Sequence, residues 1–60
     1  MEQFVLLKEL PTANIGTIFT KTIFMDKMFY AYTNKKGIKI FMDDIDLVEN
    51  DKEWFKSKDK

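Results

Sequence analysis

The stretch MFYAYTNKKGIKIFM, residues 28–42, decides the fold class. Residues 28–33 place alternate side chains on opposite faces, and residues 38–42 do the same, which is the two-residue period of a β-strand. Between them, NKKG at 34–37 is a four-residue turn, and its asparagine and glycine are the residue types that accept positive φ. The stretch therefore predicts a β-hairpin.

Toward the N-terminus the same period continues, and turn residues interrupt it at intervals of roughly ten residues. Residues 4–8 form an expected first strand that is apolar on both faces, and PTANIG at 11–16 is a loop. Residues 17–24 form the second strand, with a bulge or bend expected near Thr20, and MDK at 25–27 connects it to the hairpin. The pattern predicts a mainly β domain of four to five strands, either a small SH3-like barrel or a curled antiparallel sheet.

The end of the chain predicts one short helix, over about residues 51–58. In VENDKEWFK, Asn50 resembles a helix cap, and Asp51 and Glu53 suit the first turn of the helix. Two turns of helix are not stable alone in water, so the adjacent aromatic residues must dock it. We expect Trp54 and Phe55 together to plug the open end of the barrel, with Trp54 docking the helix; the alternative is that Phe55 faces outward as an anchor for a partner.

The chain of 60 residues is expected to be a single domain, residues 1–60. So small a domain buries only about 60% of the surface of its unfolded chain. Small domains often gain support from disulfides or a metal, but this chain has no cysteine and no histidine. Self-association or a protein partner is therefore the expected support. A signal peptide and a membrane span are not expected from the sequence.

The residue types argue against an enzyme. With no histidine, no cysteine and Ser57 as the single serine, a nucleophilic triad cannot be assembled. Asp43, Asp44 and Asp46 could offer oxygen ligands to a hard cation, but their run lacks the glycine and the final glutamate of a calcium loop. We interpret it as a solvated charged segment that could face a partner, and we expect no cofactor, metal or small-molecule substrate.

Nucleic-acid binding is the alternative. Ten lysines balance ten acids, and there is no arginine, which disfavours bidentate recognition of phosphate or guanine. Charge is nevertheless uneven, because residues 1–42 carry six lysines and three acids, whereas residues 43–60 carry four lysines and seven acids. Tyr30 and Tyr32 could stack on the bases of a single strand. The lysines expected beside them are Lys21, Lys27, Lys35, Lys36 and Lys39.

Both ends of the chain resemble a small module of tailed-phage and prophage proteins. The matching segments are FVLLKELPTANIGTIF, residues 4–19, and VENDKEWFK, residues 48–56, whereas the middle of the chain carries no matching motif. The resemblance implies a phage origin and an SH3-like small barrel, with the virion or the host cytoplasm as the location. It implies no activity.

The leading hypothesis is a non-enzymatic phage protein that acts by protein–protein interaction. It would be a virion or assembly component, or a small inhibitor of a host defence protein, and it would form a homo-oligomer or bind a protein partner. The candidate interaction residues are Trp54, Phe55, Tyr30, Tyr32, Asp43, Asp44 and Asp46.

Overall fold

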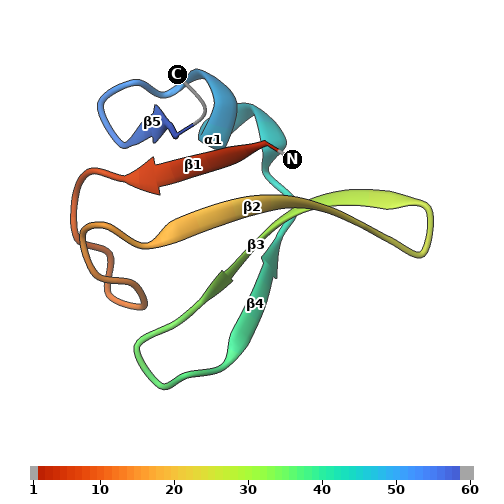
Figure 1. Cartoon of the computed structure of the whole chain (residues 1–60), viewed down its shortest axis with the longest axis horizontal. Helices are drawn as coiled ribbons and strands as arrows, with labels where there is room; N and C mark the ends of the chain where they lie inside the picture. Colours follow the sequence, from red (N-terminus) through yellow and green to blue (C-terminus); the bar gives the residue numbers. More distant parts are fainter. Residues whose placement is uncertain (1, 59–60) are drawn as a thin grey trace.

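A computed structural model describes residues 2–58 and shows one curled antiparallel sheet with a short helix (Figure 1). The strands lie in the order β4-β3-β2-β1-β5. The elements in chain order are β1 (Gln3–Leu6), β2 (Ile18–Phe24), β3 (Lys27–Thr33), β4 (Lys39–Met42), α1 (Ile45–Asn50) and β5 (Phe55–Ser57). The prediction of a mainly β fold with five strands is confirmed.

The sheet takes the curled form and not the barrel form of that prediction. In the described part of the chain β4 and β5 form the two edges and do not pair with each other, so the sheet is not closed. The bulge expected near Thr20 is absent, because Thr20 and Lys21 pair with consecutive residues of β3. The sequence suggested a bulge or bend near Thr20 and Lys21 because Ile18 and Phe24 have one parity, whereas Phe19 and Ile23 have the other. Ile23 and Phe24 lie where the β2–β3 hairpin extends past the core, so no single apolar face is required there.

Two turns fix the register of the central hairpins. Between β2 and β3, Met25 and Asp26 have φ of 52° and 61°, which is the two-residue turn that matches the twist of the strands. Between β3 and β4, Gly37 adopts a φ of 80° as expected. Asn34 does not take positive φ; its Oδ1 instead accepts hydrogen bonds from the backbone N–H groups of Lys36 and Ile38, both at 2.9 Å.

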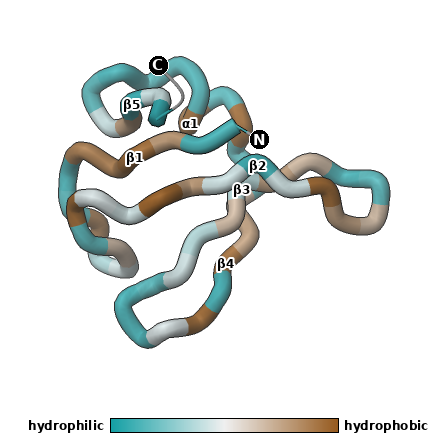
Figure 2. The backbone as a smooth tube through the Cα atoms, in the orientation of Figure 1, coloured by the Kyte–Doolittle hydropathy of each residue, from teal (hydrophilic) through white to brown (hydrophobic). Residues whose placement is uncertain are grey.

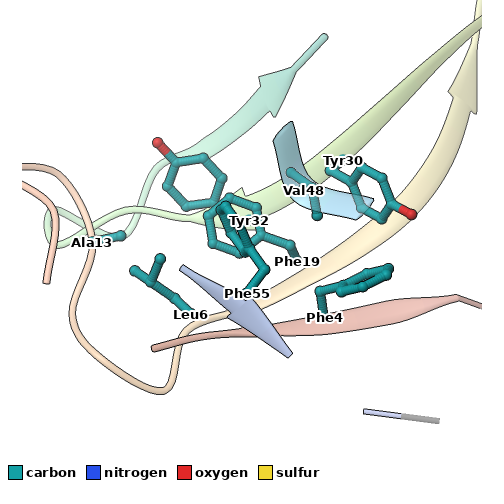
Figure 3. Close-up of a cluster of buried hydrophobic side chains, with 8 residues drawn as sticks. All are labelled: Phe4, Leu6, Ala13, Phe19, Tyr30, Tyr32, Val48 and Phe55. Carbon is teal, nitrogen blue, oxygen red and sulfur yellow. The ribbon is translucent and has the colours of Figure 1, made fainter. Parts of the chain in front are cut away.

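The core lies on the inner, concave face of the sheet (Figure 3). Stacked and edge-on aromatic rings dominate it: Phe19 stacks on Tyr32 with ring centroids 4.4 Å apart, and Phe4 meets Tyr30 edge-on at 5.7 Å. The helix contributes Val48, which is fully buried. The complete buried cluster is Phe4, Leu6, Ala13, Phe19, Tyr30, Tyr32, Val48 and Phe55.

The helix prediction is wrong in position. The helix spans Ile45–Asn50, with Asp44 as its N-cap, and residues 51–58 form a turn followed by β5. Asp44 accepts a hydrogen bond from the backbone N–H of Leu47 at 3.2 Å, so the acidic run that precedes the helix supplies the cap. Asn50, which we expected to begin the helix, is its last residue. Tertiary pairing overrides the local capping pattern, because residues 55–57 complete the sheet against β1.

Candidate interaction surface

The tyrosines proposed as a surface are core residues. Tyr30 is 0% exposed and Tyr32 is 7% exposed. The Tyr30 hydroxyl donates to Glu49 Oε2 at 2.8 Å, and the Tyr32 hydroxyl lies 3.2 Å from Thr12 Oγ1. Neither ring can stack on a base or contact a partner while the fold is intact. The period-two pattern had placed both tyrosines on one face correctly, but it could not show that the loops and α1 cover that face.

The expectation that both adjacent aromatic residues are plugs holds for Phe55 and only partly for Trp54. Phe55 is 5% exposed and meets Phe19 edge-on with ring centroids 5.0 Å apart, so it is the plug and not the anchor. Trp54 is half-buried, and the Lys8 ammonium lies 5.3 Å from the centre of its ring. Trp54 also lines an apolar groove of about 230 Å³ together with Leu10, Met42, Leu47 and Phe55. Of the pair, Trp54 is the one that a partner could reach.

Lys21 is unavailable to a phosphate because it lies between two carboxylates. Its Nζ is 2.9 Å from Glu49 Oε2 and 3.1 Å from Glu2 Oε1. The hydrogen bond from Lys21, followed by that from Tyr30, holds the pKa of Glu49 below its ordinary value. The same pairing, with Glu49 first and Glu2 second, raises the pKa of Lys21. These groups tie β2 and β3 to the end of α1.

Lys35 is also engaged, since its Nζ is 2.7 Å from Glu9 Oε2 and this contact lowers the pKa of Glu9. By contrast, Lys27, Lys36 and Lys39 have no carboxylate partner within residues 2–58. The structure therefore divides the five candidate lysines into two that are paired with carboxylates and three that are exposed and unpaired.

The outer face of the sheet carries an aromatic cluster that the sequence reasoning missed. Phe41 lies between Phe24 and Phe29, with ring centroids 5.6 Å and 5.7 Å away. Lys27 lies 6.0 Å from the ring centre of Phe29, and Lys39 lies 5.9 Å from that of Phe41. The sequence pattern could have predicted this cluster. Alternation places Phe29 and Phe41 on the face of the sheet opposite to the tyrosines, and the core covers one face only.

The β2–β3 hairpin projects from the body of the molecule (Figure 1), and Figure 2 shows hydrophobic positions within it. Near its end, Met25 is 84% exposed and Ile23 is 70% exposed. We call Ile23, Phe24, Met25 and Met28 the apolar tip; all four are exposed. Exposed apolar side chains that lie together on a surface are candidates for an interaction site.

The acidic candidates lie between β4 and α1. Asp44 is occupied as the helix cap, Asp46 lies in the first helical turn, and Asp43 is exposed. Within residues 2–58 no group of three or more acidic side chains is gathered closely enough to hold a metal ion. No helix in that same range is long and apolar enough to cross a membrane.

Comparison with known proteins identified no relative of this chain. The chain matches no known family model, and neither a curated protein nor a solved structure is significantly similar to it. The resemblance to a phage module therefore stays a prediction that rests on the quoted motifs.

Proposed function

We propose that this chain is a non-enzymatic phage protein that acts by binding another protein through the apolar tip of its β2–β3 hairpin. The phage origin is supported only by the sequence motifs. The mode of action is supported by the surface, and above all by the exposure of four large apolar side chains at the end of a projecting hairpin.

The size of the apolar tip favours a protein as its partner. A large side chain buries about 200 Å² when fully covered, so the tip offers roughly 500 Å² of apolar surface. This surface is divided between the two faces of the hairpin, because Ile23 and Met28 share one face and Phe24 lies on the other, near Phe41. A partner with an apolar groove would gain most from Met25, since methionine adapts its shape to irregular cavities. The partner is either another virion protein or a host defence protein.

Site-specific photo-cross-linking tests this function. A photoreactive amino acid at Met25 should give a discrete adduct with one other protein in infected cells. The same amino acid at Lys52, an exposed residue in the turn after α1, is the matched control and should give none. Recovery of the adduct from purified virions would indicate an assembly role, and recovery from host cytoplasm would indicate an inhibitor. Equal labelling from both positions would contradict the proposal.

Nucleic-acid binding remains a second candidate because of the aromatic cluster on the outer face. Phe29 and Phe41 with Lys27 and Lys39 combine rings and cations, as single-strand binding sites do. This candidate predicts binding of oligothymidylate that weakens with salt and is lost in Phe41→Ala. The protein proposal predicts no such binding, because within residues 2–58 just two lysines without a carboxylate partner lie beside these rings. Fluorescence anisotropy of a labelled oligonucleotide separates the two.

A further inference from the structure

Within residues 2–58, the edge strand β4 has main-chain groups on its outer side that pair with no other strand. Asn34 N donates to Ile38 O at 2.8 Å, and antiparallel pairs alternate between bonded and non-bonded. Following that alternation along the register, Ile40 and Met42 bond to β3, whereas the N–H and C=O groups of Lys39 and Phe41 point away from it. β4 is the outermost strand on this side of the sheet. Another strand could therefore add there.

The sequence around β4 is complementary to itself when it is reversed. Lys36 lies before the strand and Asp44 after it, each four residues from Ile40. If two copies pair antiparallel with Ile40 at the centre, the turn that carries Lys36 in each copy lies near the acidic segment that carries Asp43 and Asp44 in the other. In the same register Ile38 lies opposite Met42. One end of the strand is thus cationic and the other anionic, so the antiparallel arrangement brings opposite charges together twice.

At the centre of the strand, the register about Ile40 places a cation opposite an aromatic ring. Lys39 would lie opposite Phe41 of the second copy, and in the single chain this ammonium already lies 5.9 Å from a Phe41 ring. Shifting the register to place Lys39 opposite Lys39 would set two like charges side by side, which destabilises a sheet. A lysine on an edge strand normally discourages pairing with other strands. Here the register about Ile40 gives that lysine an aromatic partner.

We infer that the free edge of β4 is a homodimer interface, in which two copies pair antiparallel about Ile40 and form one continuous ten-stranded sheet. This interface is distinct from the apolar tip, and it does not depend on the proposed function. The strand has only four residues, which places the interface at the small end of the range. The dimer is therefore weak and assembles in the micromolar to millimolar range.

A charge exchange between the two ends of the strand tests the antiparallel orientation. Sedimentation equilibrium should give a mass that rises from 7.2 kDa toward twice that value with concentration. Lys36→Glu alone and Asp43→Lys alone should each weaken the dimer by about tenfold or more, because each creates two repulsive contacts. Asp43 is chosen because Asp44 is needed as the helix cap. An equimolar mixture of the two variants should dimerise at least as well as the wild type, since opposite charges meet again.

Lys52→Glu makes the same charge change in the turn after α1, so it should leave the dimer unchanged. Hydrogen exchange locates the interface: the amides of Lys39 and Phe41 should become protected at high concentration only. A mass of 7.2 kDa at every concentration would overturn the inference. Dimerisation that leaves those two amides unprotected would also overturn it. The same holds if the single charge variants dimerise as strongly as the wild type. Failure of the tip cross-link would not affect this result.

Discussion

At the scale of single residues, the adjacent side chains of Trp54 and Phe55 contribute unequally to the free energy of unfolding. Phe55 is in the core against Phe19, whereas Trp54 is half-buried over a groove. Phe55→Ala should lower the free energy of unfolding by about 3 to 5 kcal/mol, the usual cost of deleting a buried large aromatic ring. Trp54→Ala should cost less than about 2 kcal/mol, because much of the ring stays in contact with water. Urea denaturation of both variants measures the difference.

Phe55→Leu is the conservative control and should recover most of the loss, since it refills the core with an apolar side chain. A larger loss for Trp54→Ala than for Phe55→Ala would mean that the terminal segment packs differently from the structure.

Glu49 should make the fold sensitive to acid. Its pKa is lowered in the folded state by Lys21 and Tyr30, so the folded protein binds a proton there less readily than the unfolded chain does. The stabilisation is complete above the ordinary value of 4.5 and is lost as the pH falls through the lower folded-state pKa. Melting temperatures measured between neutral pH and pH about 3 should decline on the acid side. Glu49→Gln should be less stable than the wild type at neutral pH, and its melting temperature should fall less as the pH is lowered.

Tyr30→Phe separates the two causes of that shift. It deletes the hydroxyl that donates to Glu49 at 2.8 Å and keeps the ion pair with Lys21. The acid-side decline should therefore be reduced but not abolished. If the melting temperature of Glu49→Gln falls at acid pH as much as that of the wild type, the acid sensitivity comes from other carboxylates.

At the scale of elements, α1 depends on its cap. Asp44→Ala removes the acceptor of the Leu47 N–H and should cost about 1 kcal/mol, as is typical of an N-cap. Asn50→Ala should change stability by less than about 0.5 kcal/mol, because Asn50 is exposed at the last position of the helix. Thermal unfolding of both variants compares the two cap assignments directly. The reverse order would favour a helix that begins after residue 50.

The β2–β3 turn combines backbone strain with exposure. Met25 and Asp26 both have positive φ, where Asn-Gly is strongly preferred. Replacing the pair by Met25→Asn and Asp26→Gly should therefore raise the free energy of unfolding by about 1 kcal/mol. It should also weaken partner binding, since the most exposed side chain of the apolar tip is lost. Calorimetry measures the stability, and the cross-linking yield from a photoreactive amino acid at Phe24 measures partner binding. An increase in both stability and cross-linking yield would contradict the proposed role of the tip.

At the scale of the whole molecule, dimerisation should be visible in thermal stability. Only the folded edge strand can pair, so the melting temperature should rise with protein concentration. In Lys36→Glu it should not depend on concentration, while at low concentration that variant should melt close to the wild type. Differential scanning calorimetry over the concentrations of the sedimentation experiment checks this. A wild-type melting temperature that does not change with protein concentration would contradict the weak dimer.

The sequence predicted the elements that depend on local pattern. Alternation and turn residues located four strands to within about two residues, and Gly37 took its expected conformation. The failures involve long-range contacts. β5 has only three residues and no strand pattern of its own; it forms because β1 offers an edge to Phe55. The buried tyrosines have the same explanation, since alternation separates two faces but does not say which face the loop and helix cover.

The pairing of β1 with β5 also sets when the chain can fold. Leu6 pairs with Phe55, so two residues that are far apart in the sequence must meet before this part of the sheet forms. Until Phe55 has been synthesised, β1 has one unpaired edge and the rings of Phe4 and Phe19 lack their cover. Contacts this distant in sequence close slowly, because the loop entropy is paid before the contact forms. On the ribosome the core therefore cannot close until residue 55 has emerged.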